Sequence, residues 1–168
     1  MNDVTQNSAE SPQVIAGVQN LVIILPNYND WKSLIALLPR IDSVLEPTGL
    51  SAQVLIIDDG SDESLDETAI SNLAFDHIIN ISIVELTHNL GNQRAIAVGI
   101  SYVAENMTCD YLVVMDSDHE DNPEYIPELI ETSVKHGGKM VFAARSRRSE
   151  GLVFRICYQL YRMMFRLL

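Results

Sequence analysis

Five short runs of strand-forming residues, separated by segments with helical spacing, constrain this chain more than any other feature. The runs cover residues 21–25, 53–57, 79–86, 111–115 and 140–144. Strands that alternate with helices predict βαβ units, and therefore an α/β domain with a mostly parallel sheet and helices on both faces. Ligands of such sheets collect beyond the carboxyl ends of the strands, so the residues that follow each run are the candidates for a ligand site.

Helices are expected in the intervals between the runs. Asp30 is a suitable N-cap for the first helix, whose apolar residues recur at helical spacing as far as Leu45. Pro26 is expected to stop the strand before it, and Pro47 with Gly49 to end the helix. The remaining helices are expected around 64–73, through 95–104, and from Pro123 towards His136, with a stop at Gly137-Gly138.

The chain is large enough for one ordinary α/β domain. It has 168 residues, of which 47% are hydrophobic, and this share supports a real core and excludes a wholly disordered chain. No stretch reaches the roughly 18 uninterrupted apolar residues of a membrane-spanning helix. The acidic, polar N-terminus is unlike a signal peptide. Cys109 and Cys157 fit neither a disulfide framework nor a zinc ligand set, so a reducing setting is expected.

Charge divides the chain into parts. Residues 1–138 hold 22 acidic residues and four basic ones, whereas residues 139–168 hold seven basic residues and one acidic residue. The net charge of −12 argues against a general nucleic-acid binder. We expect a flexible leader over 1–19, one ligand-binding domain over 20–150 and a basic amphipathic helix over 151–168. Such a helix lies in an anionic membrane surface or packs on a protein; its contrast with the acidic body favours the membrane.

Two acidic motifs follow the predicted strands. Asp116-Ser117-Asp118 places two carboxylates at spacing i, i+2, which suits one hard divalent cation shared with a diphosphate, although a solvated acidic turn is the alternative. Asp58-Asp59-Gly60-Ser61 offers carboxylates to a nucleobase or a ribose, although the same residues are ordinary turn formers.

Two further motifs belong to the same predicted edge. Arg94 lies in the first turn of a predicted helix, where an anion is favoured, and a surface ion pair is its other reading. Tyr28 is placed to lie beneath a base or to cap the edge of the core. His119 follows the acidic pair and is either structural or close to the metal.

Together these segments resemble the N-terminal part of a family 2 glycosyltransferase with a GT-A fold. The matching pieces occur in family order: Pro26-Asn27-Tyr28-Asn29, Ile57-Asp58-Asp59-Gly60-Ser61, Asn89-Leu90-Gly91 with Arg94-Ala95, and Met115-Asp116-Ser117-Asp118. The stretch 116–130, with Asn122-Pro123-Glu124 and Ile126-Pro127-Glu128, is similar to the polyprenyl-phosphate branch. That branch includes dolichol-phosphate mannosyltransferase and bacterial undecaprenyl-phosphate sugar transferases. The segment Ala144-Arg145-Ser146-Arg147 and the basic tail resemble it too.

The resemblance implies a role for each matching residue. Pro26 and Tyr28 would border the base, and Asp59, supported by Asp58, would hydrogen-bond the base or ribose. Arg94 would lie beside the nucleotide, and Arg145 near the donor and acceptor phosphates. Mg²⁺ or Mn²⁺ would be held by Asp116 and Asp118. The full set of implied donor-binding residues is Pro26, Tyr28, Asp58, Asp59, Asn89, Gly91, Arg94, Asp116, Ser117 and Arg145.

The implied activity is inverting transfer of a sugar from a UDP- or GDP-sugar to a polyprenyl phosphate at the cytoplasmic face of a membrane. Catalytic domains of this family run some tens of residues further, so the resemblance describes a GT-A domain truncated on its C-terminal, acceptor side, and no catalytic base is named. The alternatives are a non-catalytic module that binds a membrane or a partner, and a nucleotidyltransferase. The missing glycine-rich phosphate loop after the first strand counts against the second alternative.

Overall fold

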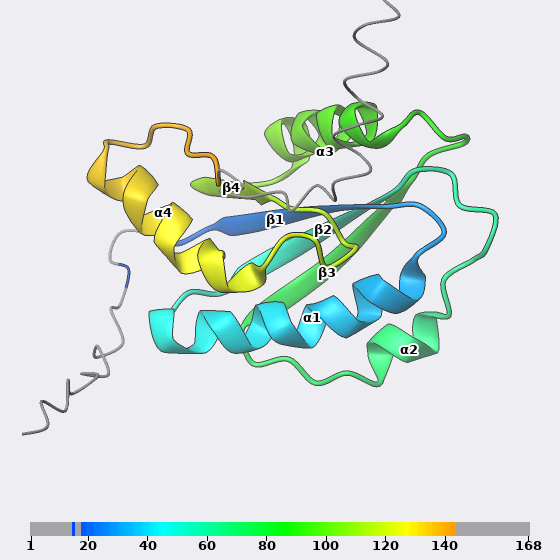
Figure 1. Cartoon of the computed structure of the whole chain (residues 1–168), viewed down its shortest axis with the longest axis horizontal. Helices are drawn as coiled ribbons and strands as arrows, with labels where there is room; N and C mark the ends of the chain where they lie inside the picture. The colour runs from blue at the N-terminus through cyan, green and yellow to red at the C-terminus, as the bar shows by residue number, and fades with distance from the viewer. Residues whose placement is uncertain (1–14, 16–17, 144–168) are drawn as a thin grey trace, which may run out of the picture.

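A computed structural model describes residue 15 and residues 18–143, and a parallel sheet lies at its centre (Figure 1). The four strands of this sheet stand in the order β3-β2-β1-β4, and every neighbouring pair is parallel. They are β1 (Leu21–Asn27), β2 (Ala52–Asp58), β3 (Ile78–Glu85) and β4 (Tyr111–Val114). This architecture confirms the predicted α/β fold class with a parallel sheet.

Helices cover both faces of the sheet, as predicted (Figure 1). They are α1 (Trp31–Leu45), α2 (Glu67–Ser71), α3 (Asn92–Asn106) and α4 (Ile126–Lys135), with short 3₁₀ turns η1 (Glu46–Thr48) and η2 (Pro123–Tyr125). Helix α3 lies on one face, and α1 and α4 lie on the other. No helix in the described part of the chain is long and apolar enough to cross a membrane.

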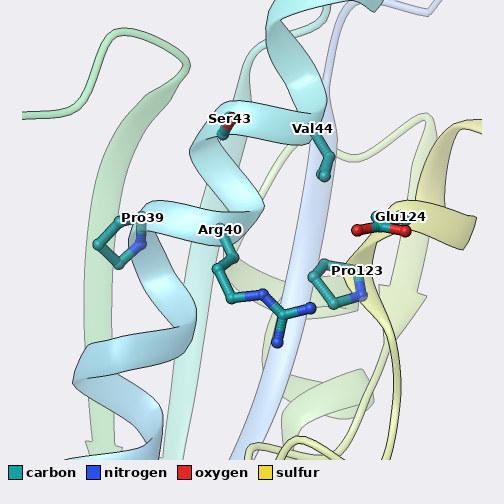
Figure 2. Close-up of a pocket in the computed structure, with 6 residues that line it drawn as sticks. All are labelled: Pro39, Arg40, Ser43, Val44, Pro123 and Glu124. Carbon is teal, nitrogen blue, oxygen red and sulfur yellow. The ribbon is translucent and has the colours of Figure 1, made fainter.

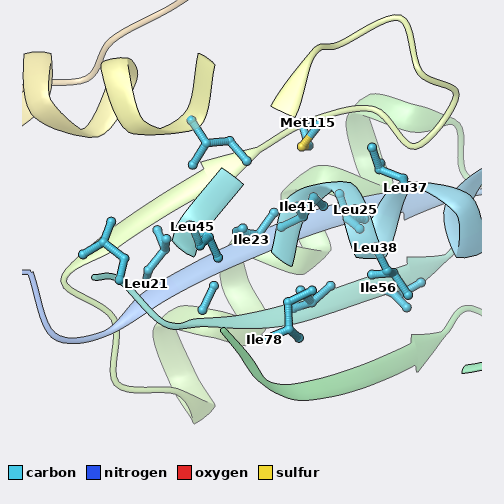
Figure 3. Packing of buried hydrophobic residues seen from close by; sticks show 14 of the residues in the cluster. Leu21, Ile23, Leu25, Leu37, Leu38, Ile41, Leu45, Ile56, Ile78 and Met115 are labelled. Atoms are coloured by element: carbon cyan, nitrogen blue, oxygen red, sulfur yellow. The ribbon is translucent and has the colours of Figure 1, made fainter. Parts of the chain in front are cut away.

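The core has one layer on each face because successive side chains of a strand point to opposite sides. In β1, Leu21, Ile23 and Leu25 pack with the apolar stripe of α1 (Figure 3). Val22 and Ile24 pack instead with residues of α3. All seven residues of β1 are buried, as expected for the central strand of a parallel sheet covered on both faces.

The first helix begins where the sequence indicated. The Asp30 carboxylate accepts a hydrogen bond from the backbone N–H of Ser33 at 3.2 Å, as an N-cap does. The helix ends at Leu45, and Gly49 follows η1 in the left-handed conformation with φ 69°. The positions of Pro47 and Gly49 therefore mark the end of the helical segment correctly.

Pro26 does not end β1, and this part of the prediction is wrong. The strand continues to Asn27, with Pro26 in register with Ile57 of β2. The pairing of β1 with β4 stops two residues before Pro26, at Ile24 and Val114. The carbonyl of Pro26 points towards the side of β1 where β4 no longer pairs, and it accepts a hydrogen bond from Ser117 there. The nitrogen of Pro26, which has no N–H to donate, points to the same side, so no sheet hydrogen bond is lost.

Two other elements differ from their predicted extent. The helix expected around 64–73 is limited to the five residues of α2. The strand expected over 140–144 is wrong for residues 140–143, which form no regular structure. A segment becomes a strand when a neighbouring strand pairs with it, and none of the four described strands pairs with this one. Ala144, Arg145, the leader (apart from residues 15, 18 and 19) and the basic segment 151–168 lie outside the described residues.

Asp42 connects α1 to the start of β3. Its carboxylate accepts backbone N–H groups of Asp76, His77 and Ile78 at 3.1, 2.8 and 2.7 Å. Burial acts to raise the pKa of Asp42, but these three hydrogen bonds together hold the pKa below its ordinary value of 3.8. Asp42 therefore stabilises the fold most when it is ionised.

Replacing Asp42 with asparagine is expected to lower the free energy of unfolding by about 1 kcal/mol at pH 7. A carboxylate with a lowered folded-state pKa stabilises the fold above its unfolded pKa and loses that effect as pH falls through the folded value. The difference between wild type and variant should therefore shrink below about pH 4. Urea unfolding of both proteins from pH 7 to pH 3 measures it, and a difference independent of pH would contradict the assignment.

Candidate functional site

The carboxyl ends of three strands are joined at one edge of the sheet. The Asn27 carbonyl accepts from the backbone N–H of Asp59 at 2.8 Å, and the Pro26 carbonyl accepts from the Ser117 hydroxyl at 2.8 Å. Ser117 is buried, so this second bond fixes the loop after β4 to the end of β1. The sequence-predicted motifs after β1, β2 and β4 therefore do meet at one rim.

Further hydrogen bonds connect the loops that follow β1 and β2. The backbone N–H of Asn29 donates to the Ser61 hydroxyl at 2.8 Å, and its side-chain oxygen accepts from the Asp62 N–H at 2.8 Å. Tyr28 lies between Pro26 and Asn29 in the sequence, and 48% of it is exposed. Part of Tyr28 is therefore exposed at this rim, as its role beneath a base would require.

Asp59 uses both carboxylate oxygens to hold another loop. Oδ1 accepts from the N–H of Leu90 at 2.7 Å, and Oδ2 accepts from the N–H of Gly91 at 2.9 Å. Only 3% of Asp59 is exposed. Asp58 accepts instead from the Ser61 N–H at 3.1 Å, through Oδ1. Asp59 thus fixes the start of α3 against the end of β2, a role that the sequence did not indicate.

The start of α3 contacts the acidic motif. Asn92 donates from its side-chain nitrogen to Oδ1 of Asp116 at 3.0 Å. Gly91 is the N-cap residue and provides no side-chain cap, while Arg94 and Asn89 are exposed nearby in sequence. No carboxylate in the described part of the chain forms an ion pair with Arg94. The surface ion pair considered for Arg94 is therefore not found there.

The turn after β4 that carries the acidic motif (residues 116–122, the acidic turn) is held by hydrogen bonds from its backbone N–H groups to its own carboxylates. The N–H of Asp116 donates to Asp121 at 3.0 Å, and the N–H of Glu120 donates to Oδ1 of Asp118 at 2.9 Å. Asn92 donates to Oδ1 of Asp116, and Glu120 donates to Oδ1 of Asp118. The other oxygen, Oδ2, of each carboxylate takes part in neither of these hydrogen bonds. Within the described residues, no group of three or more His, Cys, Asp or Glu side chains is arranged to hold a metal ion. Two carboxylate oxygens fit Mg²⁺ or Mn²⁺ when a diphosphate and water supply the other ligands.

His119 contacts Arg40 of α1. A guanidinium group has no acceptor, so the 3.3 Å contact has Arg40 donating to Nδ1 of His119. Arg40 also donates to the side-chain oxygen of Asn122 at 3.2 Å. These contacts support the structural reading of His119. Sequence reasoning gave no role to Arg40 or Asn92, although Arg40 is one of only four basic residues in 1–138.

A pocket of about 260 Å³ lies between α1 and η2 (Figure 2). Its lining residues are Pro39, Arg40, Ser43, Val44, Pro123 and Glu124. None of them is a predicted donor-binding residue. The predicted site is instead the rim formed by the loops described above.

Asn27 is the most unusual residue of this rim. It is 3% exposed, and neither its side-chain nitrogen nor its side-chain oxygen forms a hydrogen bond within the described part of the chain. An unpaired buried amide costs about 1–3 kcal/mol, so it calls for an explanation, and a functional role is one such explanation. Its position at the end of the central strand agrees with that explanation.

Comparison with known proteins places the chain in a family. The family model described as "Glycosyl transferase family 2" matches residues 22–166. Undecaprenyl-phosphate 4-deoxy-4-formamido-L-arabinose transferases of Salmonella paratyphi B and Salmonella newport are 32% identical over 139 residues. This match covers 82% of the chain and 40% of each relative, so the chain spans less than half the length of these proteins. Among solved structures, TarS of S. aureus is similar with a TM-score of 0.46 and 14% identity, over 79% of this chain and 24% of that one.

Proposed function

Because the chain belongs to glycosyl transferase family 2, we propose that it forms the donor-binding part of an enzyme that transfers a sugar from a nucleotide-sugar to a polyprenyl phosphate. The observation that supports this most is the joining of four motif-bearing segments, after β1, after β2, before α3 and after β4, at one rim through Asp59, Asn92 and Ser117. Relatives whose name includes undecaprenyl phosphate suggest the acceptor class.

The donor would lie across this rim. The exposed ring of Tyr28 is suited to stack on the base, next to the Asp58–Ser61 turn. A carboxylate has about four lone-pair sites, so Asp59 can hold the Leu90 and Gly91 amides and still accept a bond from the base or ribose, supported by Asp58. Arg94 in the first turn of α3, and Arg145 as expected from the family pattern, would face the phosphates.

Asp116 and Asp118 would hold Mg²⁺ or Mn²⁺ through the oxygens that the turn leaves unused. Such a cation neutralises the charge that develops on the departing nucleoside diphosphate. The protein's own part is to fix the two carboxylates in place: the Asn92 side chain donates to Asp116, and the backbone N–H of Glu120 donates to Asp118. Pre-organised groups of this kind stabilise charge without rearranging during the reaction.

We propose transfer by direct displacement with inversion. A phosphate oxygen of the acceptor attacks the anomeric carbon on the face opposite the diphosphate, and the departing diphosphate takes the electron pair of the broken C–O bond. The acceptor phosphate is already ionised at neutral pH, so orientation and charge stabilisation carry more of the reaction than a general base does. Transfer is proposed to occur at the cytoplasmic face of the membrane, which the basic segment 151–168 would contact.

The test is calorimetric titration of the full chain with UDP and with GDP, with and without Mn²⁺. We expect metal-dependent binding of one of them, weakened at least about tenfold by Asp118→Ala, the equivalent of about 1.4 kcal/mol. Glu105→Ala is the matched control, since Glu105 is an exposed acid near the far end of α3. Absence of nucleotide binding in wild type, or an Asp118→Ala protein that binds like wild type, would overturn the proposal.

A further inference from the structure

Arg40 of α1 makes two contacts with the acidic turn. Its guanidinium donates to Nδ1 of His119 at 3.3 Å and to Oδ1 of Asn122 at 3.2 Å. Figure 2 shows the side chain extending from α1 towards η2. The stem starts from a helix anchored by Leu37, Leu38 and Ile41, all of which are fully buried.

The two acceptors, His119 and Asn122, are each adjacent in sequence to a carboxylate residue of the turn. His119 directly follows Asp118, and Asn122 directly follows Asp121, which accepts the N–H of Asp116. One planar guanidinium therefore holds the turn at two points, each one residue away from a carboxylate. Because the guanidinium fork is rigid, fixing one contact restricts the other.

The backbone of the turn needs such support. His119 has a φ of 65°, in the left-handed region that a residue with a side chain rarely adopts. A residue in that conformation costs of order 1–2 kcal/mol and persists when its surroundings hold it there. Without the Arg40 contact, the chain around His119 would have other conformations available, and the Asp118 carboxylate would move with them.

We infer that Arg40 is a positioning residue that fixes Asp118, through His119 and Asn122, in the orientation used for the divalent cation. This rests on the proposed function, because the cation at Asp116 and Asp118 is part of that proposal. Arg40 acts through the turn and touches neither the sugar nor the diphosphate.

The Mn²⁺ affinity of Arg40→Ala distinguishes a role of Arg40 through its charge from a role in orienting the turn, because the two roles predict changes in opposite directions. Removing a positive charge near the acidic turn would strengthen Mn²⁺ binding if Coulomb attraction alone mattered. If Arg40 orients the turn, its loss weakens binding by about tenfold, as for other groups that orient a metal ligand from behind. Lys32→Ala is the matched control: it removes the same charge from an exposed position of the same helix.

The experiment has two readouts on the full chain. The first is Mn²⁺ affinity, followed by electron paramagnetic resonance, for wild type, Arg40→Ala, Arg40→Lys and Lys32→Ala. We expect Arg40→Ala to bind about tenfold more weakly, Arg40→Lys to recover part of the loss because an ammonium reaches one of the two acceptors, and Lys32→Ala to bind no more weakly than wild type. Arg40→Lys also serves if Arg40→Ala fails to fold, since the expected deficit is then smaller and in the same direction.

The second readout is hydrogen exchange of the Asp116 and Glu120 amides without metal, which we expect to be faster in Arg40→Ala. Mn²⁺ binding at wild-type strength or tighter in Arg40→Ala, with wild type still distinct from Asp118→Ala, would overturn the inference and leave the proposed function intact. If wild type binds no Mn²⁺ even when UDP or GDP is present, the proposed function fails. Unchanged exchange at these two amides in Arg40→Ala would overturn the anchoring by Arg40 as well.

Discussion

Replacement of Asp59 by asparagine is expected to lower the free energy of unfolding by about 2–4 kcal/mol in the absence of any ligand. The carboxylate is 3% exposed and accepts the backbone N–H groups of Leu90 and Gly91, one on each oxygen. Asparagine has one oxygen and one NH₂ group, so one of these amides would face another donor and stay unpaired in a buried place. The start of α3 would then lose its attachment to the end of β2.

Chemical denaturation of the ligand-free protein measures this loss. Asp62→Asn is the control, because it makes the same chemical change at an exposed residue of the neighbouring loop, and it should cost less than about 0.5 kcal/mol. Were Asp59 only a ligand-binding group, the ligand-free variant would be as stable as wild type and would lose nucleotide affinity alone. That result would remove the structural role given to Asp59.

Gly60→Ala is expected to destabilise the fold by about 2–5 kcal/mol, through two separate effects. Gly60 has a φ of 72°, which an alanine adopts only with strain. A Cβ atom at this position would also lie 2.6 Å from the carbonyl carbon of His88 and 2.8 Å from the backbone nitrogen of Asn89. Because these are backbone atoms, the loop before α3 would have to move away from the turn after β2.

Gly137→Ala separates the two effects. Gly137 has a φ of 74°, close to that of Gly60, but a Cβ there meets nothing within 4 Å. Its replacement should cost only the conformational part, about 1–2 kcal/mol. Thermal unfolding of both variants gives the difference between them. Equal losses would mean that the loop before α3 adapts freely, and the close packing of the two loops would then carry no stability.

Local patterns in the sequence predicted most of the sheet because the strands are short and their residues are mainly apolar. The run 21–25 lies in a strand whose seven residues are all buried, and the pattern of Asp30 followed by apolar residues at helical spacing marked α1 correctly. The polar residues after these strands were recognised as a candidate site for the same reason: in a parallel sheet, strand ends of one kind share one edge.

The two wrong strand predictions, at Pro26 and at residues 140–143, concern segments whose structure depends on which strand pairs with them. Pro26 continues β1 because β4 has already stopped pairing on the side that its missing N–H faces. Residues 140–143 have strand-forming side chains, but Met140 and Phe142 are largely exposed and no described strand pairs with them. A local pattern does not report which neighbour, if any, is present.

The order of apolar runs and polar ends in the sequence was sufficient to predict the fold class, the family and the edge of the sheet at which the candidate motifs meet. Tertiary structure alone decided how that edge is built: Asp59 holds the start of α3, Asn92 reaches Asp116, and Arg40 holds His119 and Asn122. These partners are between 24 and 82 residues apart. A side-chain hydrogen bond depends on a few ångströms of separation in space, which short-range spacing along the chain does not encode.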